Sequence, residues 1–354
     1  MSENYCVIMA GGVGSRFWPA STAEKPKQFL DILGTGRTLL QQTFDRFTPI
    51  IKEENILVLT NENYKDLVQE QLPGLTPGQI ICEPARRNTA PCILYAAVKI
   101  WKKNPEASFV VAPADHLITN TQEFNNAIHL GMNACKNDPT KSITLGIKPW
   151  HAATGFGYIK RGDISQEGVY QVEQFTEKPV LGVAKEMLKS ENYYWNSGLF
   201  IWNTKRLMHL YEDLQPQMFK LFKDDLSAFN TPKEKEVLKI LYPKCQDISV
   251  DYAILEQDNN VFVIPGDFGW SDLGSWSSLK DHVLSDDQDN TIIGSQHKLM
   301  KDSSNNIIVL PKEKRTLIAG LSNFIVVDTE ESLLICPIEH EQDIKSYLKE
   351  LKHQ

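Results

Sequence analysis

Short apolar runs alternate with amphipathic stretches over the first part of the chain. The uninterrupted apolar runs predict buried strands at 5–10, 56–59, 79–82, 109–112 and 143–147. Apolar residues at helical spacing predict helices between them, at 38–47, 62–72, 90–103 and 121–136. Strands that alternate with helices form βαβ units, so we expect an α/β fold with a mainly parallel, Rossmann-like sheet. Such a sheet binds ligands at the carboxyl ends of its strands.

The pattern changes after Gly155. Residues 156–160 and 169–176 alternate as strands with one exposed face, and the segments that follow predict a helix at 183–189, an aromatic strand at 195–202, several helices within 205–241 and a strand at 261–265. We interpret this region as an insertion that covers the edge of the sheet and supplies a second substrate pocket.

A polar stretch at 285–290 marks a boundary near Asp286. We therefore expect two domains, 1–285 and 286–354. Short strands in the second are predicted near 292 and at 307–310, 317–319, 325–327 and 333–336, followed by a terminal helix from about Glu339. This spacing indicates a small β unit whose strand edges could serve dimerisation.

Charge and cysteine usage narrow the class of protein. The net charge of −8 argues against broad binding to nucleic acid or to an anionic membrane surface. The chain has no run of 18 apolar residues and no signal-peptide pattern at its N-terminus. Its six cysteines are scattered without a CxxC pair, so we expect reduced thiols in a cytoplasmic protein, with no disulfide framework or zinc site.

The loop after the first strand carries the clearest candidate chemistry. Gly11, Gly12 and Gly14 can bring backbone N–H groups close to a phosphate, and Arg16 and Lys25 can neutralise its oxygens. A second lysine, at position 27, follows two residues later. The loop lacks the GxxxxGK[ST] string of a Walker A motif, and Phe17 stands where a dinucleotide fingerprint needs its third glycine. The sequence therefore outlines a triphosphate site. A plain glycine turn with solvated cations is the alternative.

Taken together, the motifs of this chain resemble those of the sugar nucleotidyltransferases, and most closely the bacterial mannose-1-phosphate guanylyltransferase family. The resemblance covers nearly the whole chain. The strings that carry it are GGVGSRFWPASTAEKPKQF from Gly11, EPARRNTAP from Glu83, PADH from Pro113, TGFGYI from Thr154, FTEKP from Phe175, WNSGLF from Trp195 and WSDLGSW from Trp270.

The resemblance implies a GT-A-like nucleotidyltransferase domain at 1–285, followed by a small β domain that is a left-handed β-helix fragment, and a homodimer. It implies transfer of GMP from GTP to mannose 1-phosphate, giving GDP-mannose and pyrophosphate, with Mg²⁺ or another divalent cation such as Mn²⁺. Long family members also carry an isomerase domain, for which this chain is too short. We expect no nucleic-acid or membrane partner.

The resemblance also implies roles for particular residues. Arg16, Lys25, Asp115 and Asp272 would be catalytic, and the last two would hold the metal. The nucleotide would be bound by Gly11, Gly12, Gly14, Arg16, Lys25, Glu83, Pro84, Asn88, Thr89, Ala90 and Asp115. The sugar phosphate would be bound by Gly157, Glu177, Lys178, Asn196 and Asp272. A structural role is expected for His116, because a phosphate nucleophile needs no general base.

Simpler interpretations stay open for these segments. Asp115 and Asp272 could be cap or turn residues, and Asn88 or Thr89 could cap a helix in which Pro91 comes early. The pair Glu177 and Lys178 could be a charged strand end.

Two rival functions also stay open. One is transfer of UMP, dTMP or AMP to another hexose 1-phosphate. The other is a non-catalytic regulatory subunit that binds GDP-mannose. The presence of all four expected catalytic residues favours an enzyme, and a plain glycosyltransferase would not need the loop cations.

Overall fold

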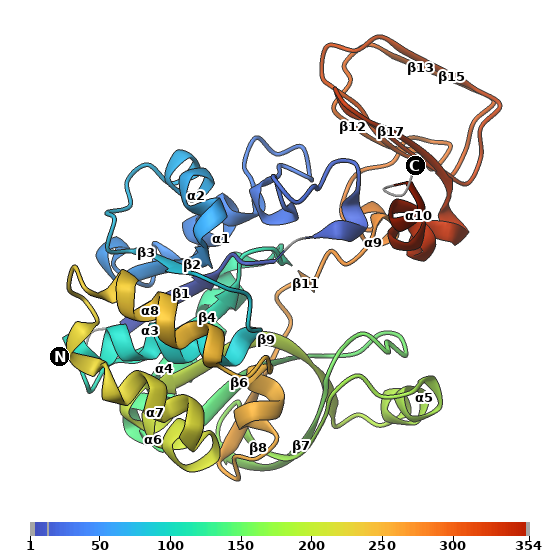
Figure 1. The fold of residues 1–354 in the computed structure, drawn as a ribbon. Coiled ribbons are helices and arrows are strands. Elements are labelled where there is room, and N and C mark those ends of the chain that lie inside the picture. The colour runs from blue at the N-terminus through green and yellow to red at the C-terminus, as the bar shows by residue number, and fades with distance from the viewer. Residues whose placement is uncertain (1–3, 13, 352–354) are drawn as a thin grey trace. The chain divides into compact units, whose positions relative to one another are not determined.

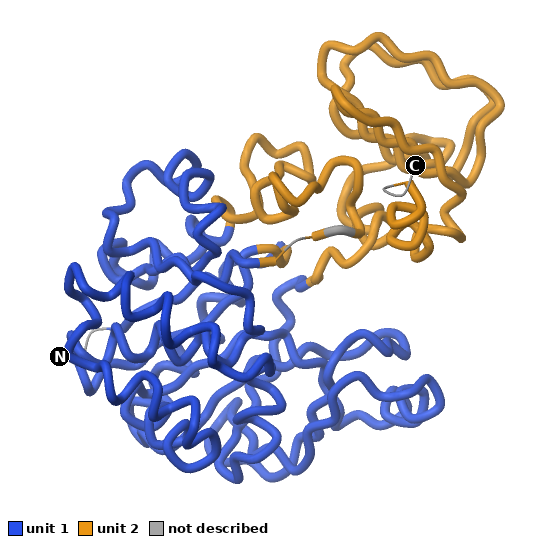
Figure 2. Tube along the Cα trace, viewed as in Figure 1, with its two compact units in different colours: residues 1–11, 43–114, 118–270 blue, residues 12–42, 115–117, 271–354 orange. Residues whose placement is uncertain are grey.

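The computed structural model describes residues 4–12 and 14–351. The chain forms two compact units (Figure 2). Unit 1 contains 1–11, 43–114 and 118–270, and unit 2 contains 12–42, 115–117 and 271–354. The glycine loop from Gly12 onward thus belongs to the same unit as the C-terminal residues, whereas Gly11 belongs to unit 1. The sequence division near Asp286 does not coincide with these units and stays a prediction.

A nine-stranded sheet forms the centre of unit 1, in the order β3-β2-β1-β4-β9-β6-β10-β8-β7 (Figure 1). Within this sheet, β8 and β9 run against the other strands, so the prediction of a mainly parallel α/β sheet is confirmed. The strands are β1 (Asn4–Met9), β2 (Ile56–Asn61), β3 (Ile80–Glu83), β4 (Ser108–Pro113), β6 (Ser142–Ile147), β7 (Tyr158–Gln166), β8 (Val169–Thr176), β9 (Tyr193–Asn203) and β10 (Val261–Gly266). Two short strands, β5 (Leu117–Ile118) and β11 (Trp270–Ser271), pair separately.

Helices cover both faces of this sheet because alternate strand residues are apolar on each side. One face packs under α3, α6, α7 and α8 in a single apolar core, and α4 packs on the opposite face (Figure 1). The helices are α1 (Leu39–Phe47), α2 (Lys65–Gln71), α3 (Thr89–Lys103), α4 (Thr121–Asn137), α5 (Leu181–Lys189), α6 (Thr204–Leu214), α7 (Pro216–Asp224) and α8 (Glu234–Leu241), with a π-helical turn at Asp251–Leu255.

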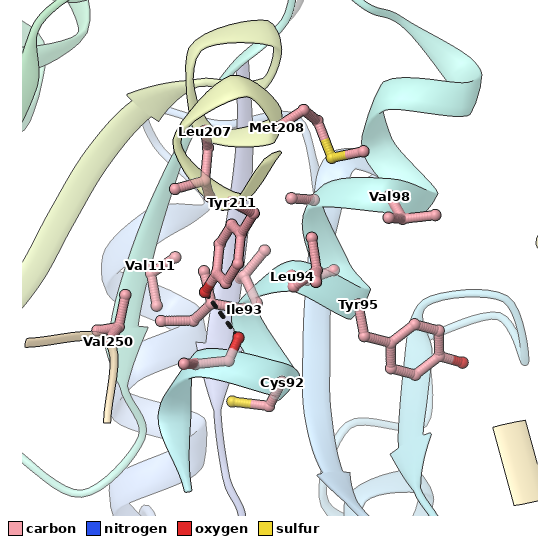
Figure 3. Close-up of a cluster of buried hydrophobic side chains, with 14 of the residues drawn as sticks. Cys92, Ile93, Leu94, Tyr95, Val98, Val111, Leu207, Met208, Tyr211 and Val250 are labelled. Atoms are coloured by element: carbon pink, nitrogen blue, oxygen red, sulfur yellow. Dashed lines mark hydrogen bonds between the residues drawn. The ribbon is translucent and has the colours of Figure 1, made fainter. Parts of the chain in front are cut away.

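The core over the first face fixes the start of α3. Figure 3 shows Tyr211 of α6 reaching toward that point, where its hydroxyl donates to the carbonyl oxygen of Ala90 at 2.7 Å. Tyr211 is fully buried, and the apolar side chains of Ile93 and Leu207 lie beside it. The segment between β3 and α3, where nucleotide contacts are expected, is therefore attached to a rigid core.

Unit 2 contains stacked coils of short parallel strands. Strands β12, β14 and β16 pair in parallel, as do β13 and β15, and β17 closes one edge antiparallel to β16. Side chains stack between coils, since the Asn306 amide donates to the side chain of Asn290 and to the carbonyl of Leu321, each at 2.8 Å. The strands are β12 (Thr291–Ile293), β13 (Lys298–Lys301), β14 (Ile307–Val309), β15 (Thr316–Ala319), β16 (Phe324–Asp328) and β17 (Leu333–Pro337). The predicted small β unit is confirmed, and its left-handed sense stays a prediction.

An apolar core joins the two ends of unit 2. Phe17, in the turn η1 (Ser15–Phe17), meets Trp276 of α9 (Trp276–Lys280) with ring centroids 4.8 Å apart. The terminal helix α10 (Ile344–Leu351) buries Ile344 in the same core. The glycine loop, α9 and α10 are thus held together by packing. Among the described residues we find no helix with the length and apolar character that a membrane span requires.

Candidate active site

A pocket of about 330 Å³ in unit 2 gathers charged side chains from distant parts of the chain. Every residue that lines it belongs to unit 2. Its charged or titratable lining residues are Arg16, Lys27, Asp115, His116, Asp272 and Lys345. The structure therefore brings together three of the four residues expected to be catalytic, and Lys25 is not among the lining residues.

Gly14 is the glycine that the geometry of the loop requires. Its φ is +57°, and a Cβ atom there would lie 2.6 Å from Cβ of Lys27 and 2.9 Å from Oγ of Ser21. A side chain would therefore clash as well as strain the backbone. At Gly11 and Gly12 the nearest atoms to such a Cβ lie 4.0 and 3.9 Å away, so those positions are not sterically restricted.

Lys27, rather than Lys25, is the lysine that enters the pocket. It is 4% exposed, and its ammonium pairs with Oδ2 of Asp115 at 3.0 Å. The same nitrogen donates to the carbonyl oxygens of Asp272 at 2.8 Å and Leu273 at 3.2 Å. Lys25 is exposed, and its backbone N–H donates to Thr22. Both lysines flank Pro26, so no sequence pattern distinguishes them, and only the fold shows which one is buried.

Asp115 is a carboxylate held next to a positive charge. Burial raises its pKa, but the charge of Lys27 and then that of His116 outweigh this, so the pKa lies below its usual value. The Nε2 atom of His116 is 4.0 Å from Oδ1 of Asp115, and the Asp115 side chain is 34% exposed. Asp115 is therefore ionised at neutral pH and accessible to a ligand.

Asp272 occupies a tight turn beside that carboxylate. Its Oδ1 accepts the backbone N–H of Gly274 at 3.1 Å, and Leu273 between them has a φ of +43°. The turn-residue interpretation is thus correct, and it is compatible with ligand binding because Asp272 also lines the pocket. The guanidinium of exposed Arg16 makes one long contact in this turn, 3.5 Å to the carbonyl of Gly274.

The expected nucleotide segment lies in unit 1 and begins a helix. Asn88 is the N-cap of α3, and its side chain accepts the N–H of Thr89 at 2.9 Å. The Thr89 hydroxyl accepts the N–H of Val250 at 2.8 Å. The capped-helix interpretation is therefore confirmed. Glu83, at the end of β3, is 7% exposed, and burial raises its pKa to about 7 against the lowering effects of Tyr242 and Arg86.

Four of the five expected sugar-phosphate residues, Gly157, Glu177, Lys178 and Asn196, lie close together in unit 1, and the fifth, Asp272, belongs to unit 2. A Cβ atom at Gly157 would lie 2.4 Å from Oε2 of Glu177. The backbone carbonyl of Gly157 accepts the N–H of Asn196 at 2.8 Å. Lys178 pairs with Glu177 at 2.6 Å. The Asn196 amide donates to Asp251 at 2.8 Å. Burial, with a smaller contribution from Glu177, raises the pKa of Asp251 to about 6.

Asp251 is not among the site residues predicted from the sequence. It lies in the π-helical turn, where no motif or periodic pattern marks it.

A family model described as "Nucleotidyl transferase" matches residues 5–289. The chain belongs to the nucleotidyl transferase family. The mannose-1-phosphate guanylyltransferase of Salmonella muenchen is 37% identical and is matched over 99% of this chain and 74% of its own length. The alginate biosynthesis protein AlgA of Pseudomonas aeruginosa is 34% identical, and the match covers 98% of this chain and 72% of AlgA. A crystal structure named mannose-1-phosphate geranyltransferase, from Thermus thermophilus, aligns over 99% of both chains with a TM-score of 0.88 and 26% identity.

Nucleotidyl transferases typically use a divalent metal, and the donor set of the unit 2 pocket fits one. Asp115 and Asp272 supply hard carboxylate oxygens, and Oδ2 of Asp272 has no hydrogen-bond partner among the described residues. The described residues contain no group of three or more His, Cys, Asp or Glu side chains that could hold a metal alone. Two carboxylates match the way Mg²⁺ binds with substrate phosphates completing its coordination.

Proposed function

We propose that this protein transfers GMP from GTP to α-D-mannose 1-phosphate, giving GDP-mannose and pyrophosphate. The observation that carries the proposal is the convergence of Arg16, Lys27, Asp115 and Asp272 on one pocket of a nucleotidyl transferase. The names of its relatives give the substrate pair. Relatives named mannose-1-phosphate guanylyltransferase match nearly the full chain at 35–37% identity.

The proposed reaction is a displacement at the α-phosphate. A phosphate oxygen of mannose 1-phosphate forms a bond to that phosphorus, the bond to the bridging oxygen breaks, and pyrophosphate leaves. The nucleophile is already an anion, so the protein supplies positioning and positive charge rather than a base. Arg16 stabilises the transferring phosphate, and Lys27 positions Asp115 and the Asp272 turn. The two carboxylates would hold Mg²⁺ or Mn²⁺, which when bound neutralises phosphate charge.

Unit 1 supplies the proposed contacts to the base and the sugar. Glu83 and the capped start of α3 contact guanine, and Glu177, Lys178 and Asn196 contact the hexose phosphate. We assign no catalytic step to Lys25, because its side chain is exposed and outside the unit 2 pocket.

We also propose a cytoplasmic homodimer. All six cysteines are free thiols, and β17, at the edge of its sheet, exposes Leu333 and Ile335 by 56% and 57%. A second copy of the chain covering this edge would remove the apolar surface from water.

Pyrophosphate release tests the proposed function against its rivals. Purified protein is given mannose 1-phosphate and Mg²⁺ with GTP, UTP, dTTP or ATP in parallel. We expect release with GTP that stops when EDTA is added. Release with another nucleotide only would overturn the assignment of Glu83 and its neighbours to guanine. No release from folded protein that binds GDP-mannose would indicate the regulatory subunit.

Glu83→Gln should remove a pH dependence from GTP binding. Guanine presents N–H donors, so the carboxylate form of Glu83 is the better acceptor. Its pKa is raised to about 7, and the affinity for GTP should therefore rise as the pH increases through that value. The variant should give a flat profile between about pH 6 and pH 8. Equilibrium GTP titrations at several pH values measure this, and equal slopes for both proteins would contradict it.

Arg16→Lys should lower kcat/KM for GTP by about tenfold to a hundredfold. A lysine keeps the charge but cannot present the two parallel N–H groups that grip a phosphate. Steady-state kinetics with varied GTP measure the loss, and exposed Arg37→Lys in the same unit serves as the control. Equal rates for Arg16→Lys and the unmodified protein would show that Arg16 is a surface cation.

A further inference from the structure

The terminal helix contributes a charged residue to the pocket of unit 2. Lys345 of α10 lines this pocket with Arg16, Lys27, Asp115 and Asp272. It lies outside residues 5–289, the part of the chain that the nucleotidyl transferase model matches. Neither the family match nor the motifs of the sequence assign it a role.

Packing fixes the position of this helix against the glycine loop. Ile344, next to Lys345, is 1% exposed and shares an apolar core with Phe17, which directly follows Arg16. Leu348, one turn further along α10, packs against the same core. The backbone that carries Lys345 is therefore held in a defined place beside the backbone that carries Arg16.

The side chain of Lys345 is available for a ligand. It is exposed, and among the described residues it forms no ion pair. Lys27 differs, because its ammonium already contacts Asp115 and two backbone carbonyls. Of the cations in the pocket, Arg16 and Lys345 are therefore the ones with donors free for phosphate oxygens.

The charge of the pocket also favours such a group. Its cations are Arg16, Lys27 and Lys345, and its carboxylates are Asp115 and Asp272. The two carboxylates offset two of the cations, and a triphosphate brings several further negative charges. Negative charge on the departing pyrophosphate grows as the bond to the α-phosphate breaks, and a lysine beside it would stabilise that charge.

We propose that Lys345 binds the β- and γ-phosphates of the nucleotide and stabilises pyrophosphate as it leaves. This proposal rests on the proposed guanylyltransferase function. It makes the C-terminal β domain a part of the phosphate site, since α10 belongs to that domain. The terminal helix has two tasks, which are to support the glycine loop through Ile344 and to supply a phosphate-binding cation.

Substitution of Lys345 tests this role against a matched control on the same helix. Lys345→Ala should lower kcat/KM for GTP and weaken product inhibition by pyrophosphate, each by about tenfold or more, while KM for mannose 1-phosphate changes little. Lys345→Arg should restore most of the kcat/KM for GTP and most of the product inhibition by pyrophosphate. Lys349→Ala, one turn along α10 and outside the pocket, should behave like the unmodified protein.

Direct binding separates this proposal from the proposed function. Calorimetric titration with inorganic pyrophosphate and Mg²⁺ requires no turnover, so it remains decisive if the protein shows no transferase activity. Weaker pyrophosphate binding by Lys345→Ala than by Lys349→Ala, at equal melting temperatures, supports the role of Lys345. Equal pyrophosphate binding by the two variants would overturn it, as would equal kinetic constants in an active enzyme.

Discussion

Lys27→Met should lower kcat/KM for GTP by about 10³-fold. The substitution removes the ammonium that pairs with Asp115 and that holds the backbone of the Asp272 turn through two hydrogen bonds. Both candidate metal carboxylates would then lose their fixed positions, and Asp115 would lose its neutralising partner. Steady-state kinetics with circular dichroism as a check on folding measure the effect.

The neighbouring lysine provides the control for that experiment. Lys25→Met removes the same charge two residues away from an exposed side chain that does not line the pocket, and we expect activity within about twofold of the unmodified protein. If Lys27→Met fails to fold, Lys27→Arg keeps the charge in a different geometry and should still be strongly impaired. A large loss for Lys25→Met with little loss for Lys27→Met would reverse the two assignments.

Asp272→Asn should lower kcat/KM by about 10² to 10³-fold and raise the Mg²⁺ concentration needed for half-maximal activity. The amide oxygen can still accept the N–H of Gly274, so the turn is preserved while one of two metal-site charges is lost. Activity measured across a Mg²⁺ series reports both effects. Asp287 is an exposed residue of the same unit, and Asp287→Asn should leave the dependence of activity on Mg²⁺ concentration unchanged. An unaltered Mg²⁺ dependence in Asp272→Asn would remove Asp272 from the metal site.

Local sequence patterns predicted most elements of unit 1 because its strands and helices have regular apolar periods. Strands β1 and β4 are uninterrupted apolar runs buried on both faces, and α3 has a wide apolar surface. Strand β13 was not predicted, since Lys298–Lys301 shows no alternation and is largely exposed. Its extended structure depends on pairing with β15 in the neighbouring coil. The local sequence pattern does not indicate this pairing.

The candidate site was harder to predict because long-range contacts decide which side chains meet. Lys27 contacts the backbone of Asp272, and Lys345 reaches the same pocket from the far end of the chain. Motif resemblance identified Arg16, Asp115 and Asp272, which the pocket brings together. It assigned the lysine role to Lys25, whereas Lys27 is the one that lines the pocket. Composition gives no sign that the helix after the β unit would supply a cation.

The unit boundary has the same physical origin. The polar stretch near Asp286 is a local feature, whereas residues 12–42 and 115–117 join the C-terminal unit through packing and hydrogen bonds to residues far along the chain. These contacts join residues that are far apart in the sequence. The apolar periodicity of a short segment gives no information about them.

Tracing the phosphorus atoms of GTP tests the proposed transfer of GMP to mannose 1-phosphate. The protein is incubated with mannose 1-phosphate, Mg²⁺ and GTP labelled at the α-phosphate, and in a parallel sample with GTP labelled at the γ-phosphate. We expect the α-label to appear in GDP-mannose and the γ-label to appear in pyrophosphate in equal amount. Label that stays in GTP, or an α-label recovered as free GMP with no GDP-mannose, would contradict it.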